Sequence, residues 1–150
     1  MRSWVALHVE DEDAAAYLLR AAIDEAGLPL NIYRVSDGEQ ALAFLLQHDP
    51  YTAARTPDVI FLDLNLPRVD GWSVLHQIEA NENLRTIPVV VLSTSAAGAH
   101  KRRALELGAR YYVTKPHSFD VFLEEITAIC TKLFPGSDDL VVHANEELRG

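Results

Sequence analysis

The feature that most constrains this chain is a regular alternation of short apolar runs with longer stretches of helical periodicity. Each of five short runs precedes a stretch in which apolar side chains recur every three or four positions. The expected strands cover residues 5–9, 30–35, 58–64, 88–93 and 111–114. The expected helices cover residues 13–26, 38–48 (with Asp37 as N-cap), 72–81, 99–107 and 118–134. The chain therefore consists of five βα units in a row.

This pattern predicts the fold class. Strands that are apolar on both faces and separated by helices indicate a parallel sheet covered on each side. Right-handed crossovers then favour an α/β, doubly wound five-stranded parallel sheet with helices on both faces. We expect one domain over residues 1–136, followed by a tail at residues 137–150. The tail contains Leu140-Val141-Val142, which is apolar enough to pack on the domain or on a dimer partner.

Composition excludes several classes of protein. The chain has 22 acidic residues against 13 basic ones and a formal charge of −9, which argues against a nucleic-acid partner. No segment approaches the roughly 20 apolar residues that a membrane span requires. The short apolar run at residues 4–9 is followed at once by acids, so it is not a signal peptide. The single Cys130, predicted to be packing filler, suits a reducing cytoplasm, and we expect a cytoplasmic protein.

Polar residues that suit phosphoryl chemistry stand where the expected strands end. They are Glu10-Asp11, Asp63 with Asn65 after it, Ser93, and Lys115. Ligands bind beyond the carboxyl ends of the strands in such sheets, at the point where the strand order reverses. Three carboxylates, a hydroxyl and a lysine are therefore expected to converge on one edge of the sheet.

Few ligands are compatible with a cluster of three carboxylates and a lysine. Neighbouring carboxylates repel, and a hard divalent cation relieves the repulsion, so the sequence predicts a Mg²⁺ site. The cation would shield Asp63 enough for its carboxylate to attack a phosphoryl group and form an acyl phosphate. Lys115 and the hydroxyl of Ser93 would then stabilise the charge of the transferred group.

Four motifs carry a resemblance to a known family. HVEDED at 8–13, FLDLNLPRVDG at 61–71, VVVLSTS at 89–95 and YYVTKP at 111–116 resemble the receiver domains of two-component response regulators. The match covers residues 4–134, and in look it is nearest to the small stand-alone regulators of bacterial phytochrome kinases. The resemblance implies the flavodoxin-like (βα)5 receiver fold.

The resemblance also implies a role for each residue of the site. Asp63 would be the phosphoacceptor and Asp11 a direct Mg²⁺ ligand, with Glu10 acting through water and Asn65 through its backbone carbonyl. Ser93 would be the switch hydroxyl, Lys115 the charge partner, and Tyr112 the aromatic residue that rotates when Ser93 moves inward.

The implied function is that of a stand-alone response regulator in a phosphorelay. It would accept a phosphoryl group from a sensor histidine kinase, with a bacteriophytochrome as candidate, and would turn over no separate substrate. Only 16 residues follow Phe134, so we expect the output to be a protein contact. The apolar surplus of helix 118–134 predicts a homodimer, and the alternative is that the tail folds back on its own domain.

Two residues depart from the family pattern, and three rival interpretations remain. His8 occupies a position that is usually aliphatic and is expected to be a core histidine satisfied by a hydrogen bond, while His117 stands where many receivers carry Phe.

A Mg²⁺-dependent phosphohydrolase would need a second acid where Asn65 stands. A flavodoxin-like cofactor binder would need a Gly-, Ser- or Thr-rich loop after the first strand, where this chain has acids. A degenerate pseudo-receiver is disfavoured by Asp63 and Lys115.

Overall fold

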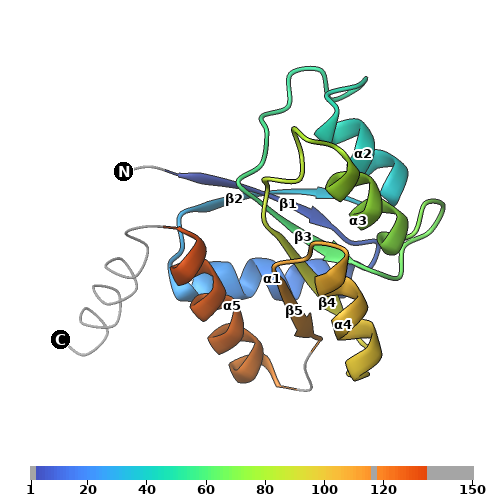
Figure 1. Cartoon of the computed structure of the whole chain (residues 1–150). Coiled ribbons are helices and arrows are strands. Elements are labelled where there is room, and N and C mark those ends of the chain that lie inside the picture. The colour runs from blue at the N-terminus through green and yellow to red at the C-terminus, as the bar shows by residue number, and fades with distance from the viewer. Residues whose placement is uncertain (1–2, 116–117, 135–150) are drawn as a thin grey trace.

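A computed structural model describes residues 3–115 and 118–134, and within them five strands alternate with five helices (Figure 1). The strands are β1 (Trp4–Val9), β2 (Leu30–Val35), β3 (Val59–Asp63), β4 (Val89–Ser93) and β5 (Tyr111–Thr114). The helices are α1 (Asp13–Ala26), α2 (Gly38–Leu45), α3 (Gly71–Ala80), α4 (Gly98–Glu106) and α5 (Phe119–Leu133). The tail at 137–150 and His117 lie outside the described residues, so the expectations for them stay predictions.

The sheet has the order β2-β1-β3-β4-β5, and every neighbouring pair is parallel. From β1 the chain first adds β2 on one side and then crosses to β3 on the other, so the winding reverses between β1 and β3. The carboxyl ends of these two strands therefore flank the crevice where ligands bind in such folds. The predicted doubly wound parallel sheet is confirmed.

Two separate cores hold the layers together. Helices α1 and α5 pack on one face of the sheet, while α2, α3 and α4 contribute to the core on the other (Figure 1). The central strands β3 and β4 are buried at every position and contribute side chains to both cores. Ile60 and Leu62 lie in the core with α2, α3 and α4, and Phe61 lies in the core with α1 and α5. Their burial on both faces explains why these runs are continuously apolar rather than alternating.

The expected helix and strand ends agree with the structure to within one residue except at the end of α2. Asp37 is the N-cap as predicted, with Oδ1 accepting a hydrogen bond from Gln40 N–H at 2.7 Å. The helix ends at Leu45 rather than His48, because Gln47 adopts a left-handed conformation with φ of 56°. His48 N–H then donates to the Ala43 carbonyl at 2.9 Å, which closes the helix end. Glycine usually marks such an end, as Gly27 does for α1, and a glutamine gives no such signal.

His8 is a core residue as expected, but one part of the expectation is wrong. The side chain is 1% exposed and lies edge-on to Phe61, and its Nε2 has no hydrogen-bond partner among the described residues. Burial, together with the positive charges of Lys115, Arg34 and Arg20, lowers the pKa of His8 to about 3. The ring is therefore neutral, and its buried nitrogen without a described hydrogen-bond partner destabilises the folded protein.

Replacing His8 with leucine is expected to stabilise the protein and to make it more resistant to acid. Below pH 6.5 the unfolded chain binds a proton at His8 that the folded protein does not take up until about pH 3. Relative to His8→Leu, the parent should therefore lose about 1.4 kcal/mol of its free energy of unfolding per pH unit as the pH falls through that window. Urea unfolding at neutral and mildly acidic pH measures the effect. The exposed His48→Leu serves as control, and an identical acid slope in His8→Leu and the parent would contradict the prediction.

Two further expectations concern Cys130 and the membrane. Cys130 is fully buried in α5, and burial raises the pKa of its thiol to about 12, so the thiol stays protonated and acts in packing as predicted. Within residues 3–115 and 118–134, none of the helices has the length and apolar character needed to cross a bilayer.

Candidate functional site

The three predicted acids meet at the switch-point edge of the sheet. Glu10 and Asp11 follow β1 directly, and Asp63 is the last residue of β3. One carboxylate oxygen from each residue lies within 4.8 Å of the others. Glu10 and Asp63 are buried whereas Asp11 is exposed, so Asp11 opens the cluster to solvent. The predicted convergence of the three acids on one edge of the sheet is confirmed.

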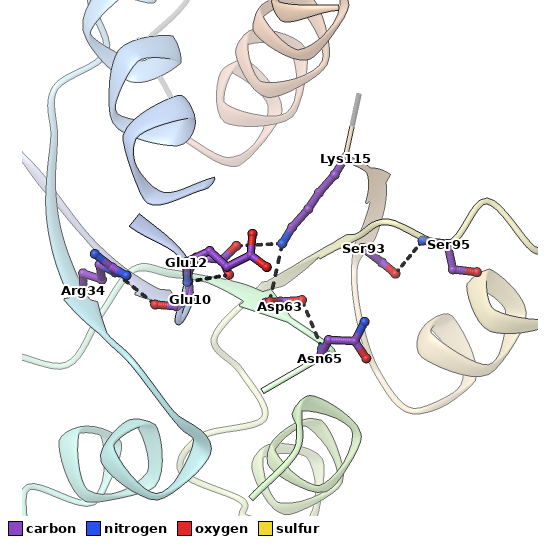
Figure 2. A network of polar contacts seen from close by, with 8 residues as sticks. All are labelled: Glu10, Glu12, Arg34, Asp63, Asn65, Ser93, Ser95 and Lys115. Carbon is purple, nitrogen blue, oxygen red and sulfur yellow. Dashed lines mark hydrogen bonds and ion pairs between the residues drawn. The ribbon is translucent and has the colours of Figure 1, made fainter. Parts of the chain in front are cut away.

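Lys115 joins the cluster from the end of β5. Its Nζ donates to Glu10 Oε1 at 2.7 Å and lies 3.4 Å from Asp63 Oδ2 (Figure 2). The backbone N–H of Lys115 donates to the Ser93 carbonyl at 2.6 Å, which extends the pairing of β5 with β4. Burial opposes the charge on Lys115, but the hydrogen bond and charge of Glu10 and the charge of Asp63 outweigh it and raise the pKa of Lys115. The lysine is therefore a permanent cation at the site.

The position of the Asp63 carboxylate is set by the loop that follows it. Asn65 N–H donates to Asp63 Oδ1 at 3.0 Å, while Asp63 Oδ2 faces Lys115. The loop itself is pressed against this strand end, because a Cβ placed on Gly71 would stand 2.3 Å from the Asp63 carbonyl oxygen. The chain thus turns tightly beneath the carboxylate, and only glycine permits that approach.

Arg34 supports the site and was not anticipated from the sequence. Its Nε donates to the Glu10 carbonyl at 3.0 Å, and its Nη1 pairs with Asp13 at 2.7 Å (Figure 2 shows the first contact). Arg34 reaches Glu10 because it lies opposite His8 in the pairing of β2 with β1. No local motif signals this contact, since it depends on the register between two strands.

The two predicted switch residues gather on Ser95 rather than on the acids. Ser95 N–H donates to Ser93 Oγ at 3.1 Å, and Tyr112 Oη donates to the Ser95 carbonyl at 2.6 Å. In the described part of the chain, neither side chain makes a hydrogen bond with the acidic cluster. The site therefore has two parts: Glu10, Asp11, Asp63 and Lys115 form the charged part, and Ser93 and Tyr112 form a polar part held by Ser95.

The electrostatics of the acids fit a hard divalent cation. Burial first, and then the hydrogen bond and charge of Asp63, raise the pKa of Glu10 to about 7 despite the opposing effect of Lys115. A buried acid with a raised pKa beside two more carboxylates marks a place where one lysine does not fully balance the negative charge. An all-oxygen donor set open to solvent on one side suits Mg²⁺, which keeps several of its waters. The residues present fit this ion.

Mg²⁺ affinity is expected to depend on pH through Glu10. The metal requires the ionised carboxylate, whose pKa in the metal-free protein is about 7, so protons compete with the metal below that pH. The dissociation constant should rise by about tenfold per pH unit below 7 and level off above it. Mg²⁺ titrations across this range measure the effect. Glu10→Gln should bind more weakly but with little pH dependence, and a parent protein whose affinity is flat between mildly acidic and mildly alkaline pH would contradict the assignment.

Fold and site together define a class of protein. A five-stranded doubly wound sheet with an oxygen-only cation site and a lysine at its switch point is the arrangement of the receiver modules of signalling proteins. The profile of the response regulator receiver domain matches residues 6–127, and the chain belongs to that family.

Two relatives illustrate the similarity in sequence. The chain is 41% identical over 117 residues to the probable methanogenesis regulatory protein FilR2 of Methanothrix harundinacea. The aligned region covers 78% of this chain and 75% of FilR2. It is 38% identical over 119 residues to the response regulator Rcp1 of Synechocystis. That aligned region covers 79% of this chain and 81% of Rcp1.

Solved structures agree with these relatives. The Mn²⁺-bound form of Rcp1 superposes with a TM-score of 0.80 at 34% identity, covering 88% of this chain and 96% of that one. The phosphorylated cyanobacterial phytochrome response regulator RcpA superposes with a TM-score of 0.79 at 35% identity, covering 86% and 92% of the two chains. The resemblance to phytochrome-associated regulators is therefore confirmed, as is the family's use of a divalent cation.

Proposed function

We propose that this chain is a stand-alone response regulator in which Asp63 accepts a phosphoryl group in a Mg²⁺-dependent reaction. The observation that carries the proposal is the pairing of Asp63 with Lys115 at 3.4 Å inside a cluster of three carboxylates. Glu10, Asp11, Asp63 and the backbone carbonyl of Asn65 would hold the metal. When bound, Mg²⁺ neutralises the acids and the charge of the incoming phosphoryl group.

In the proposed reaction an oxygen of the Asp63 carboxylate attacks phosphorus. A new O–P bond forms while the bond from phosphorus to the donor breaks, and the donor leaves with the electron pair. Asn65 N–H orients the carboxylate by holding Oδ1 at 3.0 Å. The Lys115 ammonium group, 3.4 Å from Asp63 Oδ2, would bind a phosphoryl oxygen. Ser93 would leave Ser95 N–H to donate its hydroxyl to the phosphoryl group, and Tyr112 would follow, as in the family's two-state switch.

The expected donor is a sensor histidine kinase. RcpA, which superposes over 86% of this chain, is a phytochrome response regulator, and this supports a bacteriophytochrome as the cognate kinase. We infer that the protein turns over no separate substrate, because it transfers the phosphoryl group only to itself. The inert Cys130 is consistent with the reducing cytoplasm in which such kinases deliver their signal.

Intact-mass measurement tests the proposal directly. The protein is incubated with Mg²⁺ and acetyl phosphate, a donor that replaces the kinase. The expected result is the gain of one phosphoryl group, which EDTA prevents. Absence of any gain at saturating donor would leave two alternatives: a receiver that accepts only from its kinase, or a phosphate-independent interaction module. Direct Mg²⁺ titration would then choose between them.

A homodimer through α5 is the proposed assembly, with the tail at residues 137–150 packing on the partner. Phe122, Ile126, Ile129 and Cys130 on α5 are buried in the protein's own core. The surplus is therefore smaller than the sequence suggests, and it consists of Phe119 and Val121, which are 37% and 47% exposed. Sedimentation of the unphosphorylated and phosphorylated protein tests the assembly, and a monomer at micromolar concentration in both states would exclude it.

A further inference from the structure

Helix α4 carries a basic surface on an otherwise acidic protein. Residues 94–105 contain Lys101, Arg102 and Arg103 and no acid, so the rest of the chain has ten basic residues against 22 acidic ones. All three cations are exposed. We call Lys101, Arg102 and Arg103 the basic patch. An isolated positive surface on a chain of net charge −9 creates a strong local field, and such a field favours ligands of opposite charge.

The basic patch makes no ion pair within the described part of the protein. Among the described residues, the ion pairs with N···O distances up to 4.0 Å involve Arg34, Arg55, Arg68 and Lys115, and none involves the patch. Asp70 lines the same groove as Arg103, and its carboxylate caps α3 by accepting from Ser73 N–H at 2.8 Å. Lys101 and Arg102 therefore face solvent without an ion-pair partner among residues 3–115 and 118–134.

An open groove between α3 and α4 adjoins the patch. Its volume is about 540 Å³, and its lining includes Trp72, His76, Arg103 and Leu107. The Arg103 guanidinium lies over the Trp72 ring, 4.5 Å from its centroid, which fixes the cation at the edge of an apolar wall. Leu105, on the same helix, is 41% exposed. A ligand for this surface would combine carboxylates for the cations with apolar side chains for the groove.

One residue connects this surface to the switch. Ser95 Oγ is hydrogen-bonded to His100 Nδ1 at 2.7 Å and accepts from Ala97 N–H at 3.2 Å, at the start of α4. The backbone of the same Ser95 holds Ser93 Oγ and Tyr112 Oη (Figure 2 shows the Ser93 contact). Hydrogen bonds through Ser95 therefore connect Ser93 and Tyr112 to the start of α4, the helix that carries the basic patch.

We propose that the basic patch and the adjoining α3–α4 groove bind an acidic, partly apolar segment of a partner protein, and that Ser95 couples this binding to phosphorylation. The coupling rests on the proposed function, whereas the binding surface does not. Nucleic acid fits less well, because its extended phosphate backbone would meet the acids on the rest of the surface and would leave the apolar wall at Trp72 unmatched.

The test uses a fluorescein-labelled peptide of alternating Glu and Leu and the full-length protein, read by fluorescence anisotropy at low salt. The double variant Lys101→Glu/Arg102→Glu is expected to weaken binding by about tenfold or more. The matched control is Arg20→Glu/Lys132→Glu, which changes the net charge equally at exposed positions on α1 and α5 and should change binding by less than about twofold. Circular dichroism checks that both variants fold. Equal losses in the two variants, or tighter binding of single-stranded DNA than of the peptide, would overturn the proposal.

The second part of the test repeats the peptide titration on phosphorylated protein. Protein treated with acetyl phosphate and shown by mass to carry a phosphoryl group should bind the peptide with a dissociation constant changed by about fivefold or more. A phosphorylated protein with an unchanged dissociation constant would overturn the coupling through Ser95. Failure to gain the phosphoryl group would instead count against the proposed function, and the peptide results on unphosphorylated protein would still decide the binding surface.

Discussion

Asp63→Asn is expected to abolish the gain of a phosphoryl group from acetyl phosphate while leaving the fold intact. Asparagine has nearly the same shape as aspartate, and its side-chain oxygen still accepts the hydrogen bond that Asn65 N–H gives to Oδ1. The amide is neutral and a poor nucleophile, so it does not form the acyl phosphate. The variant also removes a charge that helps to raise the pKa of Glu10, so Glu10 should ionise more readily. Intact mass after incubation with Mg²⁺ and donor measures the effect.

The matched control for this variant is Asp13→Asn. Asp13 lies near the same edge of the sheet and pairs with Arg34 at 2.7 Å, but its side chain is 98% exposed. It should gain the phosphoryl group as the parent does. If Asp63→Asn still gained the group, the acceptor would be another residue, and peptide mapping of the modified protein would identify it.

Gly38→Ala is expected to destabilise the protein by about 2–3 kcal/mol, although alanine is the better helix former. A Cβ on Gly38 would stand 2.0 Å from the Val69 carbonyl oxygen, so the loop at residues 64–70 and α2 must move apart. The same loop is anchored to α2 by Arg68, which adopts φ of 64° and lies 3.4 Å from Glu39 and 3.8 Å from Asp37. Because the loop carries Asn65, the displacement should also weaken Mg²⁺ binding.

Gly98→Ala provides a close control. Gly98 is the first residue of α4 as Gly38 is of α2, yet a Cβ there would meet nothing within 4 Å. This variant should be neutral or should gain up to about 1 kcal/mol from helix propensity. Urea unfolding gives the stabilities, and Mg²⁺ titration gives the affinities. Similar results for the two variants would show that the contact between α2 and the loop does not constrain the site.

Much of the charged part of the site was predictable because it depends on one topological fact. The carboxyl ends of parallel strands share an edge, so locating the strands was enough to bring Glu10, Asp63 and Lys115 together. The role of Arg34 was not predictable. It reaches Glu10 through the register of β2 on β1, and its own neighbours in the sequence do not encode that register.

The sequence by itself determined the five βα units, the α/β class and the acids at the strand ends, because each of these follows from side-chain periodicity among near neighbours.

Only the tertiary structure decided which contacts individual residues make, even where two residues occupy similar positions in the sequence pattern. Gly38 and Gly98 both open helices, but only Gly38 abuts another backbone. His8 was expected to find a hydrogen bond, and the packing of β1 against Phe61 leaves its Nε2 without one among the residues that the structure describes. Ser93 and Tyr112 meet on Ser95 because β4 and β5 pair side by side. Such contacts join residues far apart in the chain, and the geometry between elements, rather than the pattern within them, sets their distances.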